Sequence, residues 1–246
     1  MEIEKNIEII DGYPALYLKD IDLLVISDLQ IGFEVHLAQK GVLIPQFQFE
    51  EILNDIKKIK VISRAKRILI NGDLKHEFRE VTKQEWRETI EFLKFCKENF
   101  KEVIIVRGNH DNYLLNILKE KEFEITFYDP YYLEKDYCFL HGHKKIELPD
   151  CKYLIIGHEQ PAIVLRNEFE KVKLKAFLFG KYKNIKLIVL PSFSSISFGS
   201  EINNYLAKDF LSPYLKESEI DDFEVYAIDK TVGTLKLGKL KNLRYF

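Results

Sequence analysis

The sequence predicts a layered α/β fold with strands that are buried on both faces. Short runs of Val, Ile and Leu, such as IDLLVIS, RILINGD and EVIIVRG, are bounded by polar turn residues along the chain. Segments with helical spacing lie between these runs. The 246 residues, 46% of them hydrophobic, are enough to bury a sizeable core as one domain over residues 1–246.

Apolar periodicity places the remaining elements. Apolar residues recur at helical spacing over residues 49–56, after Pro45. A second helix is predicted over residues 86–93, preceded by Thr82 and Glu85 at the spacing of a capping box. Beyond residue 185, the segments KLIVL, DFEVYAI and VGTLKL are joined by turn residues such as Asp229-Lys230. They predict a second sheet that closes the core.

The lysine-rich stretch Lys171–Lys186 has two interpretations. Apolar residues from Val172 to Leu178 alternate with lysines, as in a strand with one buried and one solvated face. We favour a charged face or a protected sheet edge. The alternative is a track for the phosphate backbone of a nucleic acid, although a net charge of −2 provides no global attraction for one.

Five of the apolar runs end in residues of the kinds that bind metals. These residues are Asp28, Asp73, Asn109 with His110, His141 and His158. Five of the six histidines fall inside these blocks, which scattered positions would not produce. Reactive groups of α/β sheets collect beyond the carboxyl ends of the strands, so ligands far apart in sequence can converge. The pattern predicts a metal site.

The order of these blocks resembles the calcineurin-like metallophosphoesterases over roughly residues 20–200. The matching motifs are Asp28, Gly72-Asp73 with His76, Gly108-Asn109-His110-Asp111, His141 and Gly157-His158. The phrases SDLQIGFE, GVLIP and GHEQPAI are most similar to a microbial branch found beside DNA ligases and helicases. The resemblance implies a four-layer α/β/β/α sandwich: two mixed sheets packed face to face, with helices outside.

The resemblance also implies hydrolysis of a phosphate ester, a diester rather than a monoester, by a metal-activated hydroxide. Asp73 is expected to bridge two ions, since a carboxylate is small and offsets their charge. His110 is expected to protonate the leaving group, assisted by Asp111. Three further residues are candidates for supporting roles outside the coordination shell: His76, His143 and Arg107.

Those supporting roles leave alternatives open. His143 either donates to a neighbouring ligand or faces solvent, and Arg107 either touches phosphate or pairs at the surface. His76 is expected to orient ligands or substrate. His36 has no motif around it and is interpreted as structural.

The chain departs from the family pattern at two positions. Gln30 and Gln160 stand where the family usually has histidine. The resemblance assigns one ion to Asp28, Gln30, Asp73 and Gln160, and the other to Asp73, Asn109, His141 and His158. Loss of two imidazoles should weaken the first site and tilt it towards manganese or magnesium. For the protein as a whole, manganese is the expected ion, and magnesium, iron, zinc or nickel are alternatives. Alternatively, both glutamines coordinate through oxygen and both ions bind.

The remaining sequence features concern the cellular location, the cysteines and the overall composition. The N-terminal segment lacks the unbroken apolar run of a signal peptide and no run could span a membrane, so a cytoplasmic protein is expected. Three cysteines are too few for a disulfide framework. Abundant Ile, Lys and Glu resemble a thermophile's composition. A rival hypothesis is a catalytically weakened, single-metal relative that binds nucleic acid or protein.

Overall fold

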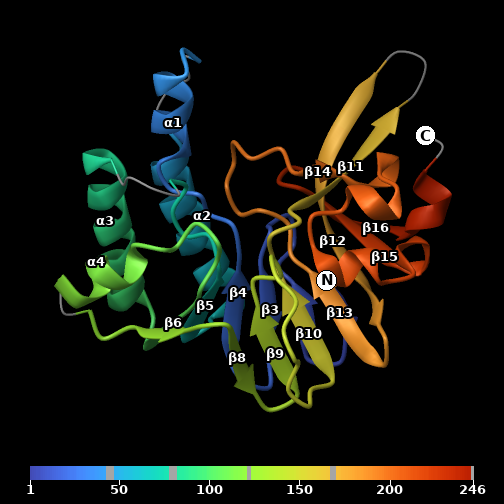
Figure 1. The fold of residues 1–246 in the computed structure, drawn as a ribbon, viewed down its shortest axis with the longest axis horizontal. Coiled ribbons are helices and arrows are strands. Elements are labelled where there is room, and N and C mark those ends of the chain that lie inside the picture. Colours follow the sequence, from blue (N-terminus) through green and yellow to red (C-terminus); the bar gives the residue numbers. More distant parts are fainter. Residues whose placement is uncertain (43–46, 78–81, 121–122, 167–169, 245–246) are drawn as a thin grey trace.

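Two mixed sheets face each other in the computed structural model, which describes residues 1–42, 47–77, 82–120, 123–166 and 170–244. The larger helices cover the outer face of the first sheet, and short helical turns cover the second (Figure 1). The predicted four-layer sandwich is confirmed.

The first sheet has the strand order β1-β2-β3-β4-β5-β6-β7. Its first four strands pair antiparallel, and β4 to β7 run parallel to one another. The bounds are β1 Glu2–Glu4, β2 Ile7–Ile9, β3 Leu16–Leu18, β4 Leu23–Ile26, β5 Arg67–Asn71, β6 Glu102–Val106 and β7 Thr126–Tyr128. The parallel half directs the carboxyl ends of β4, β5 and β6 to one edge.

The second sheet has the order β14-β11-β12-β13-β10-β9-β8, with β15 paired to β12 and β16 paired to β15. Strands β9, β10 and β13 are parallel. The bounds are β8 Tyr131–Glu134, β9 Tyr137–Leu140, β10 Tyr153–Ile156, β11 Pro161–Arg166, β12 Lys171–Tyr182, β13 Ile185–Val189, β14 Ser200–Glu201, β15 Glu224–Asp229 and β16 Gly233–Lys239. The strands expected beyond residue 185 belong to this sheet, as predicted.

Both predicted helices are present, as α2 and α3, together with helices that were not predicted. The helices are α1 Phe33–Gln39, α2 Gln48–Ser63, α3 Lys83–Asn99, α4 Leu114–Glu120 and α5 Pro213–Lys216, with 3-10 turns at Ile202–Asn204, Ala207–Asp209, Ile220–Asp222 and Leu240–Leu243. Pro45, expected before α2, lies outside the described residues. Within the described part of the chain, no helix has the length and apolar character needed to cross a membrane.

Only half of the predicted capping box forms at the start of α3. The Thr82 side chain accepts a hydrogen bond from the Glu85 backbone N–H at 3.1 Å. The Glu85 carboxylate reaches in the other direction and accepts from the backbone N–H groups of His76 and Glu77. The expected return bond is therefore replaced by a contact to the segment that follows β5.

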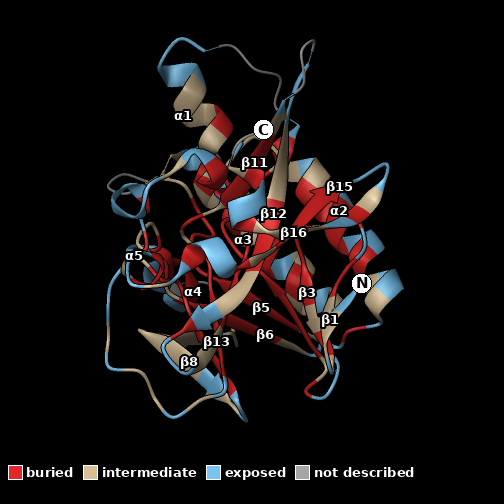
Figure 2. Cartoon of the chain, turned by 90° about the vertical axis from the view of Figure 1, so that its right-hand side faces the viewer, coloured by how far each residue is buried: buried red, intermediate tan, exposed pale blue. Residues whose placement is uncertain are grey.

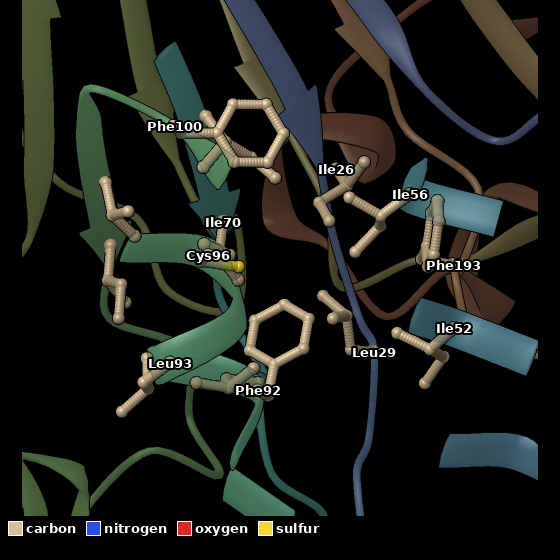
Figure 3. Close-up of a cluster of buried hydrophobic side chains, with 14 of the residues drawn as sticks. Ile26, Leu29, Ile52, Ile56, Ile70, Phe92, Leu93, Cys96, Phe100 and Phe193 are labelled. Atoms are coloured by element: carbon tan, nitrogen blue, oxygen red, sulfur yellow. The ribbon is translucent and has the colours of Figure 1, made fainter. Parts of the chain in front are cut away.

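Three buried clusters hold the four layers together, and strands alternate between them. In β5, Ile68 and Ile70 face the helices, whereas Leu69 faces the second sheet. Figure 3 shows the helix-side cluster, where Ile56 and Phe92 pack against the first sheet. A third cluster lies under α5 and the C-terminal turns. The central strands such as β5 and β6 are buried, whereas β8 is partly exposed and the helices expose one side, as Figure 2 shows.

The lysine-rich strand β12 has partner strands on both sides in its middle and on one side at its ends. It pairs with β11 over residues 171–175, with β15 over residues 175–179 and with β13 over residues 178–182. The part that carries Lys171 and Lys173 is therefore, among the described residues, an edge with a single partner strand, in line with the favoured interpretation. Lys171 and Lys173 lie 3.4 and 3.5 Å from the Glu201 carboxylate. Lys186, beyond the strand, pairs with Glu4 at 2.6 Å. These lysines form a charged face with acidic partners.

Candidate metal centre

The carboxyl ends of β4, β5 and β6 face those of β9 and β10 across the two sheets. Asn71, the last residue of β5, links the sheets because its side-chain amide donates to the carbonyls of Leu140 and Ile155, at 3.1 Å each. Its own carbonyl accepts from His141 Nδ1 at 3.0 Å. Sequence reasoning missed Asn71, which the NGD motif suggested only as part of a turn.

Five candidate ligands adopt left-handed backbone conformations that non-glycine residues rarely use. Their φ angles are 54° for Asp28, 49° for Gln30, 52° for Asp73, 64° for His158 and 51° for Gln160. Asp28-Leu29-Gln30 and His158-Glu159-Gln160 thus repeat one conformation on opposite sheets. Such strained residues cluster at functional sites, where the surrounding structure imposes them.

Glycines in the motifs make room for ligands on neighbouring strands. A Cβ on Gly108 would lie 2.2 Å from Asp73 Oδ1. A Cβ on Gly157 would lie 1.9 Å from Ser27 Oγ and 2.7 Å from Asp28 Oδ2. The Gly-Asn-His-Asp and Gly-His motifs therefore need glycine because carboxylates of the first sheet approach the backbone there.

Asp73, His141 and His158 bring one donor atom each within 4.8 Å of one another, a geometry able to hold a metal ion. His141 Nε2 lies 3.2 Å from Asp73 Oδ2. Burial disfavours charge on both side chains. Even so, the charge of His141 lowers the pKa of Asp73, and Asp73 with Asp28 raises the pKa of His141 to about 10. The site is therefore built to hold positive charge.

Two donor atoms on this side of the centre fit a metal ion. Asn109 Oδ1 is buried without a hydrogen-bond partner among the described residues, and His141 Nε2 is buried facing the Asp73 carboxylate at 3.2 Å. Because the Asn71 carbonyl can only accept, His141 Nδ1 carries the proton in the neutral ring and leaves Nε2 as the donor to metal. Buried polar atoms are rarely left unpaired without a reason of this kind.

The glutamine side of the centre is arranged differently. Gln160 Nε2 donates to Asp28 Oδ1 at 3.0 Å, and Gln160 Oε1 accepts from the Ser197 hydroxyl. Asp28 Oδ2 also accepts from Ser27 Oγ and from the His158 backbone N–H. Burial raises the pKa of Asp28 to about 6. Gln30 is buried, and its backbone N–H donates to the Asp73 carbonyl at 3.0 Å.

His110 lies at the mouth of the centre, with 23% of its side chain exposed against 2% for Asp73. Its backbone N–H donates to Asp73 Oδ1 at 3.0 Å, and its ring Nδ1 bonds to the His76 carbonyl. Nε2 stands 3.9 Å from Asp73 Oδ2. The ring is thus oriented beside the candidate bridging carboxylate.

Asp111 is buried, and its carboxylate accepts hydrogen bonds from backbone N–H groups. It accepts from the N–H groups of Asp73 and Gly108 at 2.8 Å and of Leu74 at 3.0 Å. These bonds fix the loops that follow β5 and β6 relative to each other. Its position favours an indirect role, in which it places Asp73 and the loop of His110.

The supporting candidates lie around the centre. The His143 ring is 5.5 Å from that of His141 and 6.0 Å from that of His158, and its Nδ1 is buried without a partner. Burial and the charge of His141 lower the pKa of His143 to about 4. Arg107 pairs with Asp129 at 2.6 Å. With His143, Arg107 lines a pocket of about 200 Å³ that reaches Asn109.

Two residues that sequence reasoning did not single out support the glutamine side. Ser197 fixes the Gln160 amide, as described above. Glu159 is fully buried, and its carboxylate accepts from the backbone N–H groups of Leu211 and Ser212 at 2.8 and 2.9 Å. Its position between two motif residues was the only sequence sign of this role.

Comparisons with known proteins identify the family and similar folds. The family model for calcineurin-like phosphoesterase matches residues 21–222. The nuclease MPE of Pseudomonas putida has a similar structure, with a TM-score of 0.60 and 18% identity over 90% of this chain and 92% of its own. The E. coli phosphoesterase YfcE has a TM-score of 0.42 and 19% identity over 72% of this chain and 83% of its own. Curated protein sequences give no match.

The family match extends over most of the chain and includes every block of the candidate centre. The family implies divalent metal ions and a phosphoric ester as substrate, and the clustered donor atoms of Asp73, His141 and His158 agree with such a site. This protein belongs to the calcineurin-like phosphoesterase family.

Proposed function

We propose that this protein is a metal-dependent phosphodiesterase that works with one or two divalent ions, manganese being preferred. The observation that supports this proposal most directly is the buried group of donor atoms from Asp73, His141 and His158, which lie within 4.8 Å of one another. Asn109 Oδ1 is also buried and has no hydrogen-bond partner in the described part of the chain, which a purely structural cluster would be expected to supply.

The residues divide between two ions that share Asp73. Asp73, Asn109, His141 and His158 would hold one, and Asp28, Gln30, Asp73 and Gln160 would hold the other. When bound, divalent ions lower the pKa of water and offset charge on the phosphoryl oxygens. The oxygen-only set on the glutamine side suits manganese or magnesium.

His110 would supply the proton for the leaving oxygen. The His76 carbonyl accepts from Nδ1 and so orients the ring. In the charged imidazolium, Nε2 carries the proton that can be transferred to the leaving oxygen. Asp111 would contribute by holding the Asp73 and His110 loops in place.

The test combines metal analysis with a substrate pair. The protein, freed of metal and then dialysed against Mn²⁺, is assayed with bis(p-nitrophenyl) phosphate and with p-nitrophenyl phosphate. We expect manganese-dependent hydrolysis, faster for the diester. Hydrolysis of the monoester alone would overturn the diester preference, and no hydrolysis of either would overturn the enzyme proposal.

A second candidate function is favoured by one observation. The Gln160 amide is already bonded at both ends, to Asp28 and Ser197. A protein that kept only the histidine-side ion would be a catalytically weakened relative that binds nucleic acid or protein. One bound Mn²⁺ without diester hydrolysis supports this alternative, whereas two ions with turnover support the enzyme.

A further inference from the structure

A second group of metal-binding side chains lies outside the centre described above. His36 on α1 meets His76 and Glu77 from the segment after β5, and one donor atom of each lies within 4.8 Å of the others. The His36 ring Nδ1 bonds to the Glu77 carboxylate, and the His36 and His76 ring centroids are 4.8 Å apart. His36, interpreted from sequence as an isolated structural residue, is therefore part of a cluster.

The backbone that carries this cluster is held by a buried acid. Glu85 on α3 is fully buried, and its Oε1 accepts from the backbone N–H groups of His76 at 2.9 Å and Glu77 at 2.8 Å. A Cβ on Gly32, just before α1, would lie 2.8 Å from the Glu85 side chain, so α1 starts in close contact with the same support. Glu85 therefore contacts both segments that carry the cluster, namely the start of α1 and the segment after β5.

The cluster is reachable from solvent and contains an unsatisfied atom. The side chains of His36 and Glu77 are 25% and 22% exposed. The Nδ1 of His76 is buried without a hydrogen-bond partner. An ion pair between His36 and Glu77 would explain their contact, but it leaves the His76 ring, which lies against both His36 and Phe33, without a polar partner at this atom.

We propose that His36, His76 and Glu77 form a separate binding site for a zinc-like divalent ion. Two imidazoles and one carboxylate are a ligand set that zinc uses with a water in the fourth position. This nitrogen-rich set differs from the oxygen-only set of Gln30 and Gln160. The proposed site and the glutamine side of the main centre should therefore select different metals. None of the seven residues assigned to the main centre takes part.

The site joins α1 to the segment that orients His110. The His76 ring stacks on the His110 ring with centroids 5.6 Å apart, and the His76 carbonyl bonds to His110 Nδ1. An ion held by His36, His76 and Glu77 would fasten α1 at the mouth of the main centre. The proposal does not depend on catalysis, because zinc binding can be measured without substrate.

The experiment uses the full chain with the main centre disabled by Asp73→Asn and His141→Ala. Zn²⁺ binding is measured by competition with a chromogenic chelator. We expect one Zn²⁺ per chain in this background, and affinity at least about 100-fold weaker after adding His36→Ala or Glu77→Gln. Gln39→Ala, an exposed change on the same helix, is the matched control and should keep the ion.

The same variants are also made in the otherwise natural sequence, so that the test does not depend on the folding of the Asp73→Asn, His141→Ala protein. There, His36→Ala should bind one Zn²⁺ fewer than Gln39→Ala, with circular dichroism confirming equal folding. Equal zinc stoichiometry and affinity in His36→Ala and Gln39→Ala would overturn the proposal and leave His36 and Glu77 as an ion pair only. Loss of phosphodiester hydrolysis has no bearing on this outcome.

Discussion

The histidine side and the glutamine side of the candidate centre differ in what their side chains already bind. His141 Nε2 lies 3.2 Å from the carboxylate of Asp73, a candidate ligand of the same ion, whereas Gln160 uses both ends of its amide in hydrogen bonds to Asp28 and Ser197. An ion on the histidine side would displace no amide hydrogen bond. On the glutamine side it must first displace the bond from Gln160 to Asp28. The two halves of one centre thus differ in the hydrogen bonds that an ion must replace, and we expect the glutamine side to bind an ion more weakly.

The largest effect is expected from the residue that both sides share. Asp73→Asn should remove metal from both positions and reduce phosphoesterase activity to background, because a neutral amide cannot offset two adjacent dications. Metal analysis and the diester assay check this. Asp222→Asn, at an exposed aspartate, is the control. Normal metal content with retained activity in Asp73→Asn would refute the shared-ligand assignment.

A change at His110 should leave both sides occupied and affect chemistry alone. His110→Asn keeps the backbone N–H that donates to Asp73 Oδ1, so metal content should be unchanged. Turnover should fall on the order of 10²–10⁴-fold, the usual contribution of a positioned acid. The loss should be smaller for substrates with nitrophenolate leaving groups. Metal loss in this variant would make His110 a ligand instead.

Restoring imidazoles should reduce the difference between the sides. Gln30→His with Gln160→His should tighten the second ion and lower the Mn²⁺ concentration that gives half-maximal rate, on the order of 10-fold or more. Mn²⁺ titration followed by activity measures it. Asn116→His places an imidazole on exposed α4 and should change nothing. Two equally tight ions in the natural sequence would contradict the expected difference in affinity between the two sides.

The last effect is on stability and not on metal binding, and it concerns Glu159, which lies between the candidate ligands His158 and Gln160. Burial raises its pKa from 4.5 to about 7. Between these values the native carboxyl keeps a proton that the unfolded chain releases, so its contribution to stability falls as pH rises through the window.

Glu159→Gln removes this titration and keeps an oxygen for the Leu211 and Ser212 N–H groups. Relative to the variant, the natural protein should lose up to about 1.4 kcal/mol of unfolding free energy per pH unit between pH 4.5 and 7. Denaturant titrations with a chelator present measure this. The exposed Glu50→Gln change is the control. Parallel pH profiles for the natural protein and Glu159→Gln would contradict it.

Local sequence was sufficient for the strands and for the residues at their ends. Asp28, Asp73 and Asn109 follow runs that are apolar on both faces, and β4, β5 and β6 are those runs. Parallel neighbours bring their carboxyl ends to one edge, so convergence on the first sheet follows from pattern alone. His141 and His158 follow β9 and β10 for the same reason. The family assignment depends on this order of motifs.

Contacts between distant segments were decided only by the tertiary structure. Glu85 had the spacing of a capping box, but its carboxylate accepts from the backbone N–H groups of His76 and Glu77. The alternation in β12 is that of an edge strand, but from residue 175 to residue 179 the strand also pairs with β15. The Gln160 bond to Asp28 joins residues 132 positions apart. Periodicity determines which face of an element is buried. It does not determine which polar atoms meet, because that depends on how the two sheets pack and where their loops end.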